Sequence, residues 1–470
     1  MDPALSRAFS SSGSLLPTLL ASALFMDLLD TAALGTALPT MARDFGTDPL
    51  HLRPALTAYL VTVAILVPAS GWVADRFGAR RVFSAAMLLF LSGSVCCGLS
   101  SGVGELVASR VAQGFGGAMM TPVARIIVIA ATPRERLVGA LNAFTFPAVF
   151  GPLLGPPLAG VLLSVASWRW IFFINVPIGL ASLFALRRIA PRLETRTPGP
   201  FDARGFAAAV VLIVALLTLS ESAGSQLLSS TITKSAAAVA VIAVTVLAIH
   251  SLRVRYPILE LRFLSRRVYR SSIIGGAFGR LGLGAMPFLM PLFLQSGLGW
   301  SPLETGGVMA AQMFGSLAAR PVGSFAIRRL GFRGAILGMG LLTAALTAVP
   351  SLFTDATSVW TVGTLLFSIG LARAGYYVAA NPIAFNDIEP DEVSRASTLA
   401  TVVQQLTLGF GVSLAGFLLL ISSGGETLSL PDFATTFIAL GCVTAIAIVP
   451  FLRMPADTGA NMRFGESSHD

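Results

Sequence analysis

Charged residues, and lysine above all, are what this 470-residue sequence has least of. Only 12% of its residues are charged, whereas soluble domains carry about 25%. Of the 32 basic residues, Lys234 alone is lysine and the rest are arginine. So little charge cannot hydrate a globular surface, and a chain that is 54% hydrophobic is not disordered. The composition therefore excludes a soluble enzyme and indicates a polytopic membrane protein.

Cysteine and histidine are also scarce. The three cysteines all lie in apolar runs without metal-ligand spacing, so we expect buried small hydrophobic residues and neither disulfides nor a metal site: Cys96, Cys97 and Cys442. The histidines occupy loop, span-end and tail positions, and a proton role for the first two is only a weaker alternative: His51, His250 and His469. No phosphate-binding glycine loop with its lysine occurs, so we expect neither ATP-driven transport nor an organic cofactor.

The basic excess, a formal net charge of +9, does not indicate nucleic-acid binding. The arginines are scattered between apolar runs, whereas nucleic-acid binding needs a hydrated basic face. The first apolar run follows Arg7 and begins at Leu15, which resembles a signal peptide. Asp27 and Asp30 interrupt its far end, and equally apolar runs follow along the whole chain. We interpret it as a first membrane span that stays attached.

Fourteen stretches approach the roughly 20 apolar residues that a transmembrane helix needs. The weakest is 205–221, whose apolar core is short for a full crossing. With the N-terminus in the cytoplasm, 23 loop basic residues lie inside and four outside, which predicts that both termini are cytoplasmic. The stretches are residues 14–39, 54–74, 82–100, 106–131, 138–165, 169–187, 205–221, 235–252, 271–297, 304–327, 334–353, 358–382, 394–422 and 433–452.

A weak internal repeat divides the chain. The sequence DRFGAR at 75–80 follows the second span, and RRLGFR at 328–333 follows the tenth. Parallel repeats of this kind are typical of transporters whose substrate site lies between the halves. We predict an all-α protein with an N-terminal six-helix half at 1–190, linkers and an inserted helical hairpin at 191–267, a C-terminal six-helix half at 268–455 and a cytoplasmic tail at 456–470.

Several motifs together resemble the major facilitator superfamily, in particular its fourteen-helix drug:proton antiporter branch. Pro147 and Pro156 depart from the usual glycines of the fifth-helix antiporter motif. The motifs are GWVADRFGAR at 71–80, ASRVAQGFGGA at 108–118, PAVFGPLLGP at 147–156, LDT at 29–31 with ALP at 37–39, and WRWIFFINVPIG at 168–179.

This resemblance implies a proton-coupled transporter that works by alternating access and is not an enzyme. It implies a multi-pass protein of the bacterial inner membrane that acts as a monomer. H⁺ is then the coupling ion, the lipid bilayer and a small-molecule substrate are the partners, and nucleic acid is not.

Two motifs carry predictions of conformational roles. The loop after the second span is expected to act as a gating latch, or else to be a plain cytoplasmic turn, through Gly71, Asp75, Arg76, Gly78 and Arg80. The fifth span is expected to seal the substrate path as a bent helix, or else to be a kinked packing helix, through Gly151, Pro152, Gly155, Pro156 and Gly160.

Ionisable residues inside the spans are the strongest functional candidates. Each costs about 2.5–3.5 kcal/mol at bilayer depth on insertion scales, so such groups are normally paired or face a cavity. Asp27 and Asp30 share one face of the first span, and Arg110 lies at a similar depth in the fourth. We expect the two aspartates to carry the coupling proton and Arg110 to modulate it. The alternative is a static salt bridge.

A further intramembrane arginine is Arg125, and three more lie in the second half: Arg280, Arg320 and Arg373. These three are predicted about 10–15 Å from the cytoplasmic ends of their spans, which is odd for an exporter of cationic drugs. They predict an anion site, unless each reaches loop carbonyls or the acidic cluster Asp387, Glu389, Asp391 and Glu392. Expected to share the cavity are Tyr376, Tyr377, Asn381, Gln404 and Gln405, with Phe288, Met290 and Phe293 as lining or as plain packing.

Three functions are therefore compared. The leading hypothesis is proton-coupled export of small organic molecules such as drugs or toxic metabolites. The alternative is export of organic anions or their metal chelates, for example polycarboxylates. A non-transporting receptor or sensor is a third possibility, against which the complete motif set argues.

Overall fold

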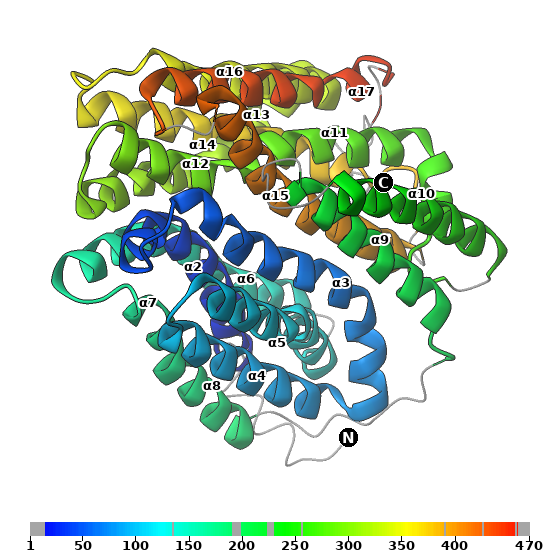
Figure 1. Cartoon of the computed structure of the whole chain (residues 1–470). Coiled ribbons are helices and arrows are strands. Elements are labelled where there is room, and N and C mark those ends of the chain that lie inside the picture. The colour runs from blue at the N-terminus through cyan, green and yellow to red at the C-terminus, as the bar shows by residue number, and fades with distance from the viewer. Residues whose placement is uncertain are drawn as a thin grey trace. The chain divides into compact units, whose positions relative to one another are not determined.

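The computed structural model describes residues 15–133, 136–189, 199–222, 230–254, 257–389, 392–424, 427–455 and 458. Every regular element in these ranges is a helix (Figure 1). Helices satisfy all backbone hydrogen bonds within one segment, which a chain this apolar requires inside a bilayer. The chain divides into two compact units, Met1–Phe201 and Asp202–Asp470.

The first unit is a bundle in which α2 packs along α6 and α4 along α5. Phe83, Phe90 and Phe144 are fully buried in its core. Ile174 separates α7 from α8 within the predicted sixth span. The elements are α2 (Leu15–Asp44), η1 (Pro49–Leu52), α3 (Arg53–Phe77), α4 (Ala79–Leu99), α5 (Val103–Ala131), α6 (Leu137–Val165), α7 (Trp170–Phe173) and α8 (Asn175–Ile189).

The second unit has two separate apolar clusters, one around Phe263 and Tyr269 and one around Tyr376 and Phe451. Its elements are α9 (Ala203–Ser222), α10 (Ser230–Arg253), η3 (Leu261–Ser265), α11 (Arg267–Gly284), α12 (Met286–Leu292), η4 (Phe293–Gly297), α13 (Pro302–Ala348), η5 (Val349–Leu352), α14 (Val359–Ile383), α15 (Val393–Ser423), α16 (Leu430–Ile446) and α17 (Val449–Leu452).

Helix α13 is two helical segments joined at a glycine. Its 47 residues would measure about 70 Å as one helix, more than twice the roughly 30 Å of a hydrocarbon core. Gly331 interrupts it with φ 75° and ψ 171°, which is not helical. Gly78, between α3 and α4, has φ 88° and occupies the same place in the internal repeat. The repeat seen in the sequence is therefore a repeated turn, and only glycine adopts its backbone without strain.

Thirteen helices of the described residues are long and apolar enough to cross a membrane. One of them, Pro302–Leu352, contains the break at Gly331. The exact number of fourteen spans stays a prediction. The weakest predicted span, 205–221, lies entirely within α9, and Ala203–Ser220 is one of the thirteen candidates.

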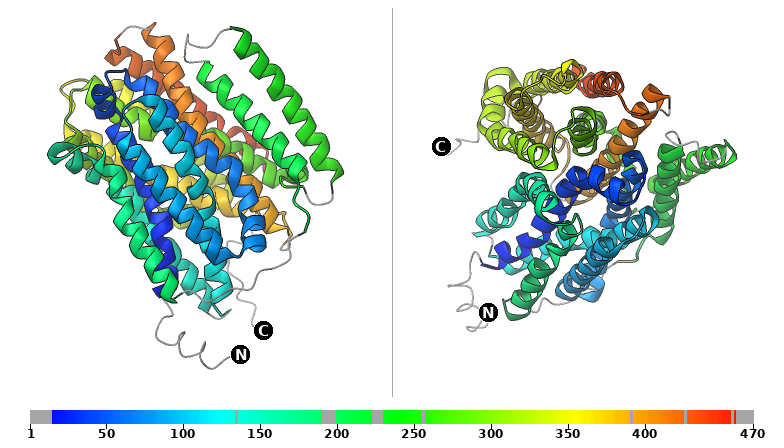
Figure 2. Two further views of the ribbon diagram at one scale, coloured as in Figure 1. Left: turned by 60° about the horizontal axis from the view of Figure 1, so that its bottom comes forward. Right: turned by 60° about the vertical axis from the view of Figure 1, so that its left-hand side comes forward.

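Helices α9 and α10 lie side by side as a hairpin (Figure 2). Asp202 connects the two ends of this hairpin. Its Oδ1 accepts from the N–H of Gly205 at 2.9 Å and pairs with His250 Nε2 at 2.7 Å. Its Oδ2 accepts from the N–H of Ile258 at 3.0 Å. Burial opposes this, but these partners together lower the pKa of Asp202 below its usual 3.8. The hairpin, predicted as a separate insertion within 191–267, thus belongs to the second compact unit.

The chain just before the hairpin is held to the first unit. Trp72 Nε1 donates to the carbonyl of Gly199 at 2.9 Å, and the Phe201 ring lies 5.0 Å from the Trp72 ring. Residues 199–201 therefore belong with α3, and the second unit begins at the next residue, Asp202.

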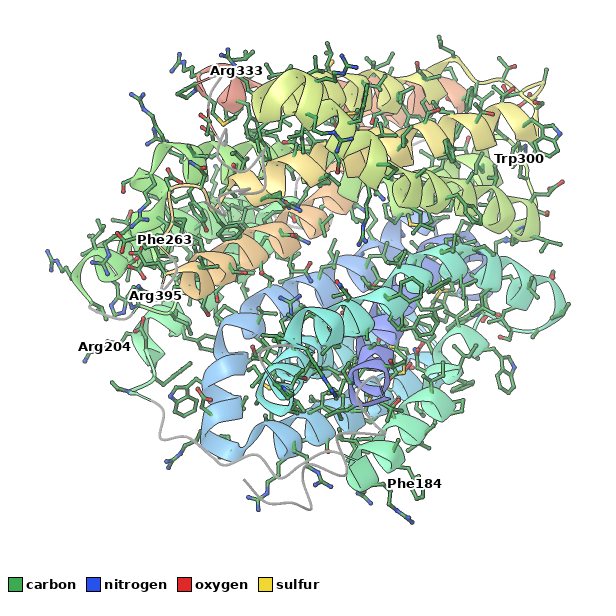
Figure 3. The ribbon with its side chains drawn as sticks, turned by 180° about the vertical axis from the view of Figure 1, so that it is seen from behind. Phe184, Arg204, Phe263, Trp300, Arg333 and Arg395 are labelled. Atoms are coloured by element: carbon green, nitrogen blue, oxygen red, sulfur yellow. The ribbon has the colours of Figure 1, made fainter. Side chains whose placement is uncertain are left out.

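Ion pairs bind the segment before α11 to α15. Buried Glu260 bonds Arg395 at 2.7 Å and Arg262 at 2.9 Å. Figure 3 shows Arg395 close to Phe263, whose ring lies 6.0 Å from the guanidinium. Arg266 pairs with Glu392 at 2.6 Å and donates to the carbonyl of Asp387. Glu260 and Glu392 are therefore already engaged in ion pairs.

The prediction for the cysteines is wrong at two of three positions. Cys97 is buried, but Cys96 and Cys442 are exposed on the protein surface. Both lie within candidate membrane spans, where an outward side chain faces lipid and not protein. All three are free thiols. Asp391, His469 and, except for Thr458, the predicted tail 456–470 lie outside the described residues.

Candidate functional site

The centre of the first unit holds a buried ion pair between Asp30 on α2 and Arg110 on α5. Both side chains are fully buried. Arg110 also donates through Nη1 to Gln113 Oε1 at 2.6 Å and through Nε to the carbonyl of Ala55 at 3.1 Å. Asp30 Oδ1 accepts from Gln113 Nε2 at 3.3 Å and from Asn175 Nδ2 at 3.1 Å. The sequence places the two charges at similar depth, and the structure joins them.

Asp27 lies one turn before Asp30 on the same helix and is only half-buried. Its Oδ1 accepts a short hydrogen bond from the hydroxyl of Tyr59 on α3. The ring of Tyr59 in turn lies 4.4 Å from the Arg110 guanidinium, a cation–π contact. The two aspartates therefore reach the same arginine, one directly and one through a tyrosine.

Glycines on α5 create the space for this tyrosine. A Cβ atom at Gly117 would lie 2.3 Å from the Tyr59 hydroxyl, and one at Gly114 would lie 2.7 Å from Thr62 Cβ. Both contacts are too close for any side chain, so the short α3–α5 approach requires glycine at these positions. The run QGFGG at 113–117 thus has two roles: Gln113 hydrogen-bonds to the ion pair, and the glycines leave space for the side chains of α3.

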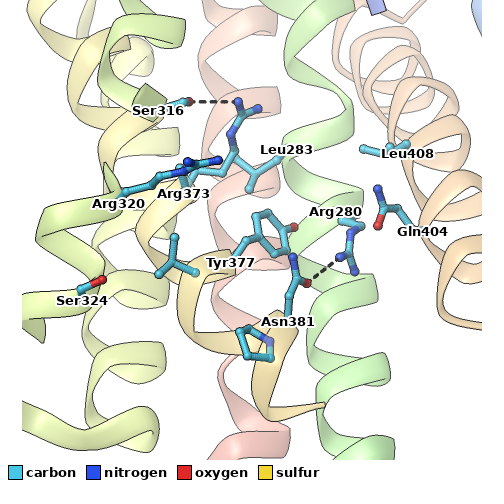
Figure 4. A pocket seen from close by; sticks show the side chains of 13 residues that line it. Arg280, Leu283, Ser316, Arg320, Ser324, Arg373, Tyr377, Asn381, Gln404 and Leu408 are labelled. Carbon is cyan, nitrogen blue, oxygen red and sulfur yellow. Dashed lines mark hydrogen bonds between the residues drawn. The ribbon is translucent and has the colours of Figure 1, made fainter. Parts of the chain in front are cut away.

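The second unit contains a cavity of about 680 Å³ between α11, α13, α14 and α15 (Figure 4). Residues four apart line it from three of these helices, because side chains at that spacing share one helix face. None of the thirteen lining residues is acidic. The principal polar ones are Ser316, Arg320 and Ser324 on α13, Arg373, Tyr377 and Asn381 on α14, Gln404 on α15 and Arg280 on α11.

The cavity arginines Arg280 and Arg373 contact neutral groups. Arg280 donates to Asn381 Oδ1 at 3.2 Å and lies 4.8 Å from the Tyr377 ring. Arg373 reaches Ser316 Oγ at 3.4 Å. Arg320 has no hydrogen bond or ion pair with any described residue. The alternative in which carboxylates of the 387–392 cluster pair with these arginines is not what the described contacts show.

Of the residues expected in this cavity, two are absent from its lining. Tyr376 is buried with its ring 6.3 Å from Phe451, and Gln405 is half-buried outside the lining. Consecutive residues of a helix point about 100° apart, so only Tyr377 and Gln404 of the two adjacent pairs face the cavity. Phe288, Met290 and Phe293 are buried among other side chains and do not line it. Arg125 lies at an exposed position of α5.

Comparison with known proteins identifies the family to which this chain belongs. A family model described as Major Facilitator Superfamily matches residues 20–288 and 272–468. The chain belongs to the major facilitator superfamily.

Relatives within the superfamily match along nearly the whole chain. A protein named putative multidrug resistance protein MdtD from Pectobacterium carotovorum subsp. carotovorum (strain PC1) is 35% identical over 441 residues, covering 92% of this chain and 94% of the relative. A protein of the same name from Escherichia coli (strain SE11) is 35% identical over 448 residues, covering 93% and 94%. This member of the major facilitator superfamily is accordingly a membrane transporter.

Solved structures share the fold at lower identity. A POT family transporter in complex with a thioalcohol conjugated peptide has a TM-score of 0.67 at 16% identity, covering 94% of this chain and 95% of that one. A bacterial homologue of the human lysosomal transporter Spinster, inward-facing and unoccupied, has a TM-score of 0.66 at 16% identity, covering 99% and 100%.

The predicted gating loop at 71–80 and its repeat at 328–333 make equivalent contacts, each within its own unit. Arg80 Nη2 donates to the carbonyl of Arg187 at the end of α8, at 2.9 Å. Arg333 Nη2, at the repeat position, donates to the carbonyl of Leu452 in α17 at 2.7 Å. Each loop thus binds the last helix of its own compact unit. Asp75 is half-buried, Gly78 is buried and Arg76 is exposed, whereas half-buried Gly71 has open space where a Cβ would lie.

The helix that carries the motif PAVFGPLLGP at 147–156 is α6, which packs against α2. A Cβ at Gly151 would lie 2.9 Å from Leu28 Cβ, and one at Gly155 would lie 2.8 Å from Ala32 Cβ. The helix runs unbroken from Leu137 to Val165 although it contains Pro147, Pro152, Pro156 and Pro157. Gly160 is buried on the same helix. These glycines set the approach of α6 to the helix that carries both aspartates.

Sequence reasoning missed Tyr59, Asn175 and Ser94. Ser94 Oγ accepts from Asn175 Nδ2 at 3.0 Å and donates to the carbonyl of Phe172 at 2.9 Å, which fixes the amide that bonds Asp30. Asn175 stands inside the motif WRWIFFINVPIG, and Gln113, also missed, inside ASRVAQGFGGA; both were available signals, because a polar amide inside a span needs a partner.

Proposed function

We propose that this transporter is a proton-coupled antiporter that exports small organic molecules by alternating access. The observation that carries the proposal is the buried pair Asp30–Arg110, with Asp27 one turn away on the same helix. Carboxyl groups inside membrane spans are typical of proton relays, and a buried one is normally paired with a compensating charge. The relatives' name, multidrug resistance protein, supports drugs or toxic metabolites as cargo.

Protonation of Asp30 would change the network in a defined way. The neutral acid no longer compensates the charge of Arg110, whose other contacts, to the oxygens of Gln113 and Ala55, are to neutral groups. Asn175, bound to Asp30 Oδ1, links the same carboxyl to α8. A proton arriving at Asp30 therefore weakens contacts among α2, α5 and α8 together, which is the kind of change that favours a different packing of the unit.

Asp27 is the more accessible of the two acids and would exchange protons with the aqueous path. Its hydrogen bond from Tyr59 and the contact of that ring with Arg110 couple it to the inner pair. Loss of the hydroxyl in Tyr59→Phe should therefore shift the pH dependence of transport while the buried ion pair stays formed.

The test uses the full chain in proteoliposomes under an imposed pH gradient. Protein carrying the natural sequence should drive uptake of a fluorescent cationic dye on the side that corresponds to export, and Asp30→Asn should abolish the response to the gradient. The control is Asp44→Asn, which makes the same change on the same helix at an exposed carboxylate bound to Arg169. Retained coupling in Asp30→Asn, or equal loss in Asp44→Asn, would refute the assignment of Asp30.

A second candidate, export of organic anions or their metal chelates, is favoured by the arginine-lined cavity. Three guanidiniums line about 680 Å³ without an acidic side chain in the lining. Like charges repel, and a bound polycarboxylate would relieve the repulsion through charge-assisted hydrogen bonds. Tyr377 and Asn381 would add neutral hydrogen-bonding groups to the same ligand.

Competition decides between the two cargo classes. Citrate and a cationic dye are tested for binding to purified protein of natural sequence and to Arg373→Gln. Loss of citrate binding only in the variant supports the anion class, with Arg328→Gln, an exposed arginine of α13 outside the lining, as the matched control. Unchanged binding in Arg280→Gln, Arg320→Gln and Arg373→Gln would exclude it. Binding of either ligand without transport would instead favour a sensor.

A further inference from the structure

A second cavity in the same unit lies far along α11 from the first, at the helix's beginning. It has a volume of about 480 Å³ and is lined by α11 and by the chain around α17. Its charged lining residues are Arg267, Arg270 and Arg453, all exposed. Neither the proposed proton site nor the arginine-lined cavity shares a residue with it.

The lining of this cavity changes from charged to apolar along the helix axis. Arg267, Arg270, Ser271 and Ile274 occupy positions i, i+3, i+4 and i+7, which form one stripe of α11. Ile274 lies about 10 Å deeper than Arg267 at 1.5 Å per residue, and its side chain is 40% exposed. Pro450 and Met454 complete the apolar wall. A ligand with an anionic head and an apolar tail matches this gradient.

Among the described residues, the three guanidiniums have no acidic partner, unlike their neighbour Arg266. Arg266 is paired with Glu392, and Asp387 Oδ2 accepts from the N–H of Val268. Arg267, Arg270 and Arg453 form no ion pair with any described residue. Arg270 Nη1 makes one long contact, to the carbonyl of Leu264 at 3.5 Å.

The start of α11 does not itself attract the anion, because Asp387 already occupies it. The carboxylate of Asp387 binds the N–H of Val268 in the first turn of the helix. Attraction for a phosphate group must therefore come from the arginine side chains. Two come from α11 and one from a segment more than 180 residues later, so the cation cluster exists only in the folded unit.

We propose that this cavity is a binding site for an anionic phospholipid. The phosphate is held by Arg267, Arg270 and Arg453, and the start of an acyl chain lies along Ile274, Pro450 and Met454. The arginines match an anionic head group, and the change from charged to apolar lining along α11 matches an acyl chain. A free phosphate has no apolar part that could contact the apolar wall, so a lipid is favoured. The proposal does not depend on which molecule the transporter exports.

The test measures binding of phosphatidylglycerol to the purified full chain by native mass spectrometry, with phosphatidylcholine as the neutral comparison. Each arginine near a membrane surface contributes roughly fivefold in affinity for anionic lipid. The variant Arg267→Gln, Arg270→Gln, Arg453→Gln should therefore bind phosphatidylglycerol about 100-fold more weakly. Its binding of phosphatidylcholine should not change.

A control variant removes three exposed arginines that do not line the cavity: Arg188→Gln, Arg328→Gln and Arg329→Gln. It should keep tight binding, and an equal loss in this control would show that only general surface charge is involved. Ile274→Asn keeps all three cations and should weaken the lipid but not inorganic phosphate. If inorganic phosphate displaces phosphatidylglycerol at equal concentration, or if the cavity variant binds the lipid unchanged, the proposal is overturned.

Discussion

The pair Asp30–Arg110 allows a sharp test of how the first unit is held together. The perturbations are Asp30→Asn, Arg110→Gln and the two combined. Each single change leaves one buried group without its charged partner, whereas the double variant leaves no buried charge at either position. If the pair is formed as the structure shows, the two changes are not independent.

The expected size follows from the contacts. Removing one partner of a buried ion pair costs about 3–5 kcal/mol of unfolding free energy. Asp30→Asn should fall in this range, because its two oxygens face only donors, from Arg110, Gln113 and Asn175, and an amide supplies only one acceptor. Arg110→Gln should cost less, since Asp30 keeps the two amide donors. The double variant should be about 2–3 kcal/mol more stable than the sum of the singles predicts.

The assay is denaturant unfolding of the four proteins in one detergent, with helical content followed by circular dichroism. Destabilisations that add within about 0.5 kcal/mol would refute the ion pair as the link between α2 and α5. Transport by the double variant gives a second readout. A folded double variant that transports down a substrate gradient but ignores a pH gradient agrees with proton coupling, and one that still responds to the pH gradient does not.

Three other outcomes can be checked on the same purified protein. Gly331→Ala should lower the free energy of unfolding by about 1–3 kcal/mol, because its backbone region is almost exclusive to glycine. The control Gly338→Ala, in the same helix with open space at its Cβ, should stabilise the protein slightly. Equal thermal midpoints of the two variants would contradict the break in α13. Gly117→Ala should displace the Tyr59 hydroxyl and impair pH-driven transport, with Gly104→Ala in the same helix as the unaffected control. Because the pKa of Asp202 is lowered in the folded protein, the stability that its carboxylate contributes should be complete above pH 4 and lost as the pH falls further. The unfolding midpoints of Asp202→Asn and of the natural sequence should therefore converge in acid. A difference that stays constant with pH would contradict this.

The existence and approximate place of the apolar helices could be predicted from the sequence because they depend on one-dimensional properties. A run such as 205–221 forms α9 although its apolar core is short, since helix formation extends through the flanking residues. The depth of a residue also follows from counting, which is why Asp30 and Arg110 were expected within reach of each other. The break at Gly331 is predicted by the similarity of RRLGFR at 328–333 to DRFGAR at 75–80, the loop that contains Gly78.

Rotational position about the helix axis could not be predicted in the same way. Spans that are apolar on every side give no period from which to decide which face is inward. Tyr376 and Tyr377 therefore looked equivalent in sequence, but one packs on Phe451 and the other lines the cavity. The same limit hid Tyr59, whose hydroxyl reaches Asp27 only because of how α3 is rotated against α2.

The attachment of residues 199–201 to Trp72 has a consequence for how the halves of the chain can move. Phe201 is held by the first unit, and Asp202, the next residue, is bound by three groups of the second. No slack chain separates the two anchors. Any change in orientation between the units must be absorbed by the backbone torsion angles at this one junction, or must first release Trp72 or Asp202. The covalent connection is thus a hinge of two residues and not a flexible tether.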